Sequence, residues 1–246
     1  MLGFLRSPSV FAVVALVARL IGPAHATEPP LAVDAAVVLA ADVSRSIDDA
    51  EFALERRGYG EAIQSQKLID AISTGPHGAI ALAYVEWAGE GEQKLVVDWT
   101  PIRNAADGRD MAARIVGAPR SFVGRTAIGS AIDFSFAQFA EIPFSTERRI
   151  IDVSGDGTSN QGRAVTVARD AAVAGGAIIN GLTIYNKRAA SLGGYLALHT
   201  NPPGGLALYY QRNVIGGAGA FVVPIDDFAS FGDAMVRKLV NEIAER

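Results

Sequence analysis

Oxygen-bearing side chains stand at three turns of this chain, in a set that could bind a hard divalent cation. Asp42, Ser44 and Ser46 follow an apolar run in the order Asp-x-Ser-x-Ser. Thr126 comes directly after Gly-Arg, and Asp156 lies in a Ser-Gly-Asp-Gly run behind a second apolar segment. Carboxylate and hydroxyl oxygens are the ligands that Mg²⁺ prefers, and Mg²⁺ usually keeps some of its waters. The sequence therefore predicts a metal site built from these residues.

Each of these residues also has an ordinary structural explanation. Ser46 and Thr126 are residue types that cap helices, and Asp156-Gly157 is a common turn dipeptide. The run from Ser46 to Asp49 resembles a capping box. Asp42 and Ser44 could simply end a strand and begin a turn. The joint occurrence of three oxygen-bearing segments favours the metal site over these separate explanations.

Strand geometry selects Asp156 over the nearby Asp152 as a ligand. Four residues of a strand cover about 13 Å, so Asp156 can lie at the strand tip while Asp152 lies deep within the strand. An aspartate in mid-strand is costly unless it is paired or hydrogen-bonded. The sequence indicates no partner for Asp152.

Apolar runs and amphipathic stretches alternate along the chain, which is typical of a mostly parallel sheet covered by helices on both faces. The predicted strands are 35–41, 79–87, 94–99, 149–154, 177–185 and 220–224. The connection between the second and third is too short for a parallel crossover, so one edge strand should be antiparallel. Helices are predicted to begin at Thr126, to span 162–174, and to follow a cap at Asp226 or Asp227.

The order Asp-x-Ser-x-Ser, Thr, Asp-Gly resembles the metal-ion-dependent adhesion site (MIDAS) of von Willebrand factor type A domains, and the resemblance covers residues 33–246. It implies an α/β fold, a three-layer doubly wound, Rossmann-like sandwich. The mostly parallel six-stranded sheet would have the order 3-2-1-4-5-6 and one antiparallel edge strand. The run 151–160, the N-terminal segment and the closing Gly-Gly-Ala-Gly-Ala-Phe-Val-Val resemble an exported bacterial subgroup with no assigned biochemical role.

The resemblance also assigns roles to the site residues. Ser44, Ser46 and Thr126 would supply hydroxyl ligands, and Asp42 and Asp156 would bind directly or through water. One coordination position would remain for an acidic group of a partner. The glycine- and hydroxyl-rich run around Asp156 departs from the usual strand end of that family and leaves open what Ser154 and Thr158 contribute.

The N-terminal residues 1–26 have the features of a secretory signal peptide. Arg6 precedes an apolar stretch, and Ala24-His25-Ala26 fits the small-x-small cleavage rule. An uncleaved anchor is the alternative, but the apolar stretch is shorter than the about 20 residues that a membrane span needs. We expect residues 27–246 to form one periplasmic or secreted domain with no stable membrane span after cleavage.

Several function classes are excluded by composition. The formal net charge is −4 and there is no basic cluster, so nucleic-acid binding is not expected. The chain has no cysteine and three histidines, too few for a standard zinc site. It also lacks the Gly-x-Ser-x-Gly elbow of serine hydrolases and the phosphate-binding P-loop.

The favoured function is an exported binding module whose Mg²⁺ site is completed by an Asp or Glu of an extracytoplasmic protein. Mn²⁺ and Ca²⁺ are alternative ions. A second hypothesis is a Mg²⁺-dependent hydrolase of phosphoesters with Asp42 or Asp156 as nucleophile. The motif offers no lysine and no obvious general acid, only Arg45 and Arg125 as neighbouring cations. A structural envelope protein with a vestigial site is the third hypothesis.

The segment 186–218 has little periodicity and should leave the sheet beside the strand that carries Asp156. Ligands of open α/β sheets bind outside the carboxyl ends of the strands, so this connection is expected to border the metal face. Tyr209 and Tyr210 are either partner contacts or local core under the connection.

Overall fold

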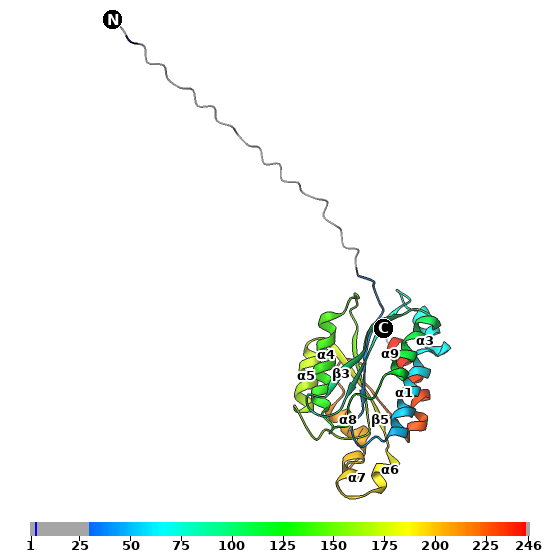
Figure 1. The fold of residues 1–246 in the computed structure, drawn as a ribbon, viewed down its shortest axis with the longest axis vertical. Helices are drawn as coiled ribbons and strands as arrows, with labels where there is room; N and C mark the ends of the chain where they lie inside the picture. The colour runs from blue at the N-terminus through cyan, green and yellow to red at the C-terminus, as the bar shows by residue number, and fades with distance from the viewer. Residues whose placement is uncertain (1–2, 4–29, 245–246) are drawn as a thin grey trace.

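The computed structural model describes Gly3 and residues 30–244, and Figure 1 shows a central sheet with helices on both faces. The strands are β1 Ala36–Asp42, β2 Ile80–Trp87, β3 Gln93–Ile102, β4 Arg149–Gly155, β5 Ala177–Ile184 and β6 Val222–Ile225. The main helices are α1 Asp49–Ile63, α2 Gln66–Ser73, α3 Ala105–Gly117, α4 Ile128–Ala137, α5 Val165–Ala174 and α9 Phe231–Ala244. Two 3₁₀ turns are η1 Gln138–Glu141 and η2 Phe228–Ser230.

The six strands form one sheet in the order β3-β2-β1-β4-β5-β6. All neighbouring pairs are parallel except β2 and β3, which are antiparallel at the edge. This confirms the predicted fold, including the strand order and the antiparallel edge strand. Because β1 and β4 are adjacent and parallel, Asp42 and Asp156 lie at the same edge of the sheet.

The central strand β1 is an almost continuous apolar run and is buried on both faces. In β1, Val37 and Leu39 belong to the core under α1, α2, α3 and α9, whereas Val38 and Ala40 belong to the core under α4, α5 and the helix that contains Tyr210. A strand covered on both faces reads as a continuous apolar run rather than as an alternation of polar and apolar residues.

The final helix follows the predicted pattern. Asp227 accepts a hydrogen bond from Ser230 N and caps the turn that precedes α9. The apolar residues at helical spacing along η2 and α9 form one buried stripe; its members are Phe228, Phe231, Met235, Leu239 and Ile243. Burial of this stripe against α1 holds α9 on the sheet.

The 186–218 connection is more regular than its sequence indicates. It contains three short helices, α6 Lys187–Ser191, α7 Gly194–Thr200 and α8 Leu206–Asn213. Gly193 and Gly205 are the N-caps of α7 and α8. These helices have 7 and 8 residues, too few to show a clear hydrophobic period in the sequence. Figure 1 shows α6 and α7 projecting beyond the end of the sheet.

The predicted signal peptide, residues 1–26, lies outside the described residues apart from Gly3. Within the described ranges, no helix combines the length and the apolar character that crossing a membrane requires.

Candidate metal centre at the carboxyl edge of the sheet

The five predicted site residues lie together at the carboxyl edge of β1 and β4, and all are at least 98% buried; they are Asp42, Ser44, Ser46, Thr126 and Asp156. Asp42 is the last residue of β1, and Asp156 follows directly after β4. Ser44 and Ser46 occupy the turn that connects β1 to α1. Thr126 ends the loop before α4.

Hydrogen bonds connect these side chains in one chain. Oδ1 of Asp42 accepts from Ser44 N at 2.8 Å. The hydroxyls of Ser44 and Ser46 are 3.2 Å apart, and Ser46 Oγ donates to Asp156 Oδ1 at 2.6 Å. Thr126 Oγ1 donates to Ser44 Oγ at 3.3 Å. The oxygens of three separate segments therefore converge on one small volume.

Neither Ser46 nor Thr126 caps a helix. The N-cap of α1 is Asp48, which forms a capping box with Glu51. The predicted capping box between Ser46 and Asp49 is therefore wrong: the box lies two residues later, between Asp48 and Glu51, because the chain turns once more before α1 begins. The helix expected at Thr126 begins at Ile128, and no side chain caps it. The hydroxyls of Ser46 and Thr126 therefore bond other site residues instead of helix ends.

The surroundings of the two aspartates disfavour their negatively charged forms. Oδ2 of Asp42 is buried and has no hydrogen-bond partner among the described residues. Burial, and then the neighbouring Asp156, raise the pKa of Asp42 well above its usual range. Burial likewise raises the pKa of Asp156 to about 6. Two buried carboxylates and three neighbouring hydroxyls, with one carboxylate oxygen unpaired, are a donor set that suits a hard cation.

Within the described residues no cluster of three or more His, Cys, Asp or Glu side chains has the geometry to hold a metal. A cation at this edge would depend on hydroxyl ligands in addition to the two carboxylates.

Arg120 fixes the turn that carries the serines. Its Nη2 donates to the carbonyls of Val43, Ser44 and Ile47 at 2.9, 3.1 and 2.8 Å. The guanidinium also lies over the ring of Phe52. Three carbonyls held by one planar group leave the turn little freedom, so Arg120 positions Ser44 and Ser46 from outside the site.

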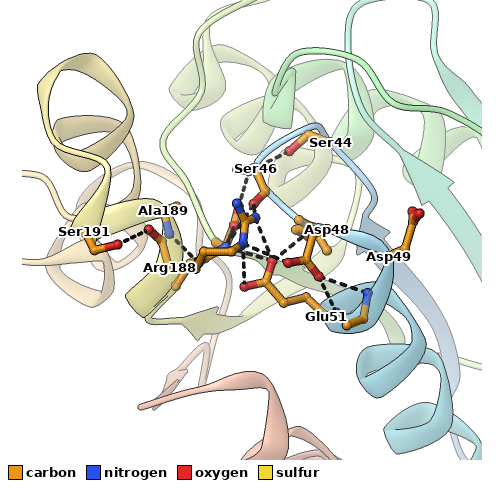
Figure 2. A network of polar contacts seen from close by, with 12 residues as sticks. Ser44, Ser46, Asp48, Asp49, Glu51, Arg188, Ala189 and Ser191 are labelled. Carbon is orange, nitrogen blue, oxygen red and sulfur yellow. Dashed lines mark hydrogen bonds and ion pairs between the residues drawn. The ribbon is translucent and has the colours of Figure 1, made fainter.

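The start of the 186–218 connection supports Asp156. Asn186 Nδ2 donates to Asp156 Oδ2 at 2.7 Å and to the carbonyl of Ser46 at 3.0 Å. Figure 2 shows Arg188 reaching across to the same turn, where it bonds the carbonyl of Ser46 and pairs with Glu51 at 2.9 Å. The connection therefore does border the site, as expected.

His199 of α7 lies behind Thr126. Its Nε2 is 3.2 Å from Thr126 Oγ1, and its Nδ1 is 3.2 Å from Thr158 Oγ1. Thr158 N donates to the backbone carbonyl of His199 at 3.0 Å. Burial lowers the pKa of His199, which favours the neutral ring. Thr158 thus acts on the site through His199, whereas Ser154 points away and donates to Glu55 at 2.8 Å.

The two tyrosines of the connection do not form an exposed partner surface. Tyr210 is fully buried in the core, which is the second of the two alternatives for it. Tyr209 is half-buried, and its hydroxyl accepts from Ser159 N at 3.2 Å. Sequence reasoning missed Arg120, Asn186 and His199, because their positions follow no spacing relative to the motif. A single signal existed for His199, which is one of only three histidines in the chain.

Comparisons with known proteins agree with this fold. A family model described as "Protein of unknown function (DUF1194)" matches residues 32–246. No curated protein matches the sequence significantly. Among solved structures, proximal thread matrix protein 1 from the mussel byssus, with a zinc-occupied MIDAS motif, is 15% identical with a TM-score of 0.57. That match covers 87% of this chain and 49% of the mussel protein.

Two further structures show the same likeness. The pilus adhesin SpaC from Lactobacillus rhamnosus GG has a TM-score of 0.59 at 12% identity, over 85% of this chain and 30% of the adhesin. A von Willebrand factor type A protein from Catenulispora acidiphila has a TM-score of 0.52 at 14% identity, over 86% of this chain and 43% of its own. The chain thus spans about half or less of these proteins and has the von Willebrand factor type A-like fold.

Proposed function

The chain belongs to the DUF1194 family of proteins of unknown function, and we propose that it is an exported, metal-dependent binding module. Its site would hold a divalent cation, Mg²⁺ in the first place, through Asp42, Ser44, Ser46, Thr126 and Asp156. The bound cation would supply an open coordination position for an Asp or Glu side chain of an extracytoplasmic protein. The expected location is the periplasm or the extracellular space.

One observation carries the proposal. Oδ2 of Asp42 is buried and unpaired among the described residues, while its Oδ1 is held by Ser44 N at 2.8 Å. Leaving a buried carboxylate oxygen unsatisfied costs free energy that a cation would recover. The three hydroxyls and Asp156 Oδ1 each lie within hydrogen-bonding distance of another member of this set, so the remaining ligands are already gathered in one place.

The likeness to other proteins supports a binding role. The mussel matrix protein has a zinc-occupied MIDAS motif, and SpaC is a pilus adhesin. At these identities the likeness concerns the fold, so the binding role for this chain depends on the site chemistry above.

Phosphoester hydrolysis remains the alternative, and the site chemistry supports it less. A hydrolase needs a general acid near the reacting group. The ring nitrogens of His199 are both engaged by threonine hydroxyls, and its lowered pKa keeps the ring neutral. Arg45 and Arg125 are poor proton donors because a guanidinium keeps its proton at ordinary pH.

The test is a metal titration followed by heat unfolding and calorimetry. Mg²⁺ at a hundredfold excess over its Kd should raise the free energy of unfolding by about 2.7 kcal/mol. Asp42→Asn and Asp156→Asn should lose this stabilisation. The metal-free Asp42→Asn variant should be at least as stable as the original chain, because the amide oxygen can still accept from Ser44 N without a buried charge.

Asp133→Asn is the matched control, since Asp133, on the exposed side of α4, pairs with Arg163. It should keep the full Mg²⁺ effect. Equal stabilisation by Mg²⁺ in Asp42→Asn and in the original chain would refute the assigned site. Release of phosphate from a phosphoester panel that requires Asp42 would favour the hydrolase.

A further inference from the structure

A cleft opens directly beside the candidate metal centre. It has a volume of about 530 Å³, and its floor includes Ser46 and Thr126. Its walls come from the β1–α1 turn, the loop before α4, the loop between β4 and α5, and α7; they are Arg45, Gly124, Arg125, Asn160, Tyr195, Leu196 and His199. We call this cavity the arginine cleft. The guanidinium side chains of Arg45 and Arg125 both line the cleft beside the metal centre.

Arg45 and Arg125 are exposed, and neither side chain forms a hydrogen bond or an ion pair within the part of the chain that the structure describes. Other arginines near the site are engaged by the protein itself, as Arg120 is by three carbonyls and Arg188 by two carboxylates. Two unengaged guanidinium groups on one cleft provide charge complementary to an anionic ligand.

Tyr195 of the cleft wall is one of three exposed apolar side chains close together along the α6–α7 segment. Leu192, Tyr195 and Leu198 are 64%, 66% and 63% exposed, and we call them the apolar ridge. Val123, adjacent to Gly124 of the cleft wall, is 64% exposed. Exposed apolar groups that gather in one place mark an interaction surface. Figure 1 shows α6 and α7, the segment that carries the ridge, projecting beyond the end of the sheet.

The ridge is connected to the metal centre through one side chain. Tyr195 stacks on His199, with ring centroids 5.8 Å apart and planes 7° from parallel. His199 in turn lies 3.2 Å from Thr126 Oγ1. The ridge therefore has a fixed position relative to the site, and a partner that touches both meets a preorganised surface.

We propose that the arginine cleft and the apolar ridge bind one extended protein segment with a composite acidic and apolar motif. This inference rests on the proposed function. One carboxylate of the segment completes the metal centre, and a second acidic side chain, close in sequence, pairs with Arg45 or Arg125. An apolar or aromatic side chain of the same segment packs on the ridge. The ridge selects among the many segments that carry a carboxylate.

Phage display can determine which residue types the surface prefers in such a segment. Random 12-residue peptides are selected against the immobilised protein in the presence of Mg²⁺. Elution with EDTA isolates the metal-dependent binders. The expected binders carry at least two acidic residues and one large apolar residue within a few positions. A synthetic peptide of the strongest binder then serves as the probe for affinity measurements by fluorescence anisotropy.

Three variants separate the parts of the surface. Arg45→Ala with Arg125→Ala, and Leu192→Ser with Leu198→Ser, should each weaken the probe about tenfold or more, as truncated interface anchors do. The ridge variant should keep its Mg²⁺ stabilisation. Arg57→Ala with Val167→Ser is the matched control, because both residues are exposed and neither lines the cleft. The control should bind the probe normally.

The outcomes distinguish this inference from the proposed function. EDTA-eluted peptides with a single acid and no apolar preference, or equal probe affinity in the ridge variant, would overturn the composite motif and leave metal-dependent binding intact. An absence of EDTA-eluted peptides would overturn both. Mg²⁺-independent binding to phosphatidylglycerol vesicles that is lost in the ridge variant would assign the ridge to a lipid surface instead.

Discussion

The ammonium nitrogen of Lys238 lies 2.6 Å from Oδ1 of Asp152, and both side chains are fully buried. A buried aspartate in the middle of a strand needs a partner, and Lys238 of α9 is that partner for Asp152 of β4. Glu242, one turn further along α9, bonds the same nitrogen and accepts from Asn180 Nδ2 at 2.7 Å. The result is a buried cluster of one cation and two carboxylates between the sheet and α9.

Removal of the cation should therefore destabilise the fold. Lys238→Met leaves Asp152 and Glu242 buried without a counter-ion, and loss of one partner of such a pair costs about 3–5 kcal/mol. Urea unfolding at pH 8 measures this, with Lys67→Met on the surface as control. Lys238→Met combined with Asp152→Asn should recover part of the loss. A change below about 1 kcal/mol in Lys238→Met would show that the cluster is not the stabilising pair that its geometry indicates.

The stability of the metal-free protein should fall with rising pH. Burial raises the pKa of Asp152 to about 7 despite the opposing effect of Lys238. Between the unfolded pKa near 4 and this value the folded state holds more protons than the unfolded state, so the free energy of unfolding decreases as pH rises through that window. Asp152→Asn should make the decrease smaller, by on the order of 1–3 kcal/mol.

Other buried acids also contribute to this pH dependence, so the effect of Asp152 must be isolated by difference. Asp42, Glu55 and Asp156 also have raised pKa values from burial and contribute in the same direction. The diagnostic quantity is therefore the difference between the original chain and Asp152→Asn, measured by urea unfolding in EDTA from pH 5 to pH 8. Parallel curves would contradict the assignment of a proton to this cluster.

Arg120 should matter for metal affinity although it is no ligand. Arg120→Met frees the carbonyls of Val43, Ser44 and Ile47, so the serine turn loses its fixed shape. We expect Mg²⁺ affinity to fall about tenfold, in the range seen when groups that orient metal ligands are removed. Calorimetry measures it, with Arg103→Met as control because Arg103 is exposed and pairs with Asp107, away from the site. Unaltered affinity would mean that the turn keeps its shape alone.

Gly157 should tolerate no side chain while His199 is in place. A Cβ at this position would lie 2.3 Å from Nε2 of His199. Gly157→Ala should therefore displace α7 and destabilise the fold by about 1–3 kcal/mol. The double variant Gly157→Ala with His199→Ala removes the clash, so its loss should be smaller than the sum of the two single losses. If the two losses of stability are additive in thermal unfolding, the side chain at position 157 does not clash with His199.

The parts of the fold that sequence could predict are those with a local signal. Apolar runs and the short 88–92 connection specify the strands and the antiparallel edge, and the oxygen-bearing turns identify the candidate centre. The capping box was misplaced because Ser46 and Asp48 both have the chemistry of a cap, and only the path of the turn decides between them. Local pattern does not encode that path.

The long-range partners could not be predicted because nothing in the sequence pairs them. Lys238 lies on a mainly apolar helix face and is distant in sequence from Asp152, and Asn186 resembles any loop asparagine. Their roles arise from packing of α9 on the sheet and from the entry into the 186–218 connection. Only tertiary structure brings such groups within bonding distance.

The glycines on either side of Asp156 set a rule for transplanting this site. The place of a Cβ at Gly155 is taken by the hydroxyl of Tyr210, at 2.6 Å, and that at Gly157 by the ring of His199. Both rings come from the 186–218 connection. A chimera that received this connection alone would collide with ordinary side chains at its own strand end, and one that received the strand end alone would hold a bare glycine turn. The two segments can be exchanged between domains of this fold only as a matched pair.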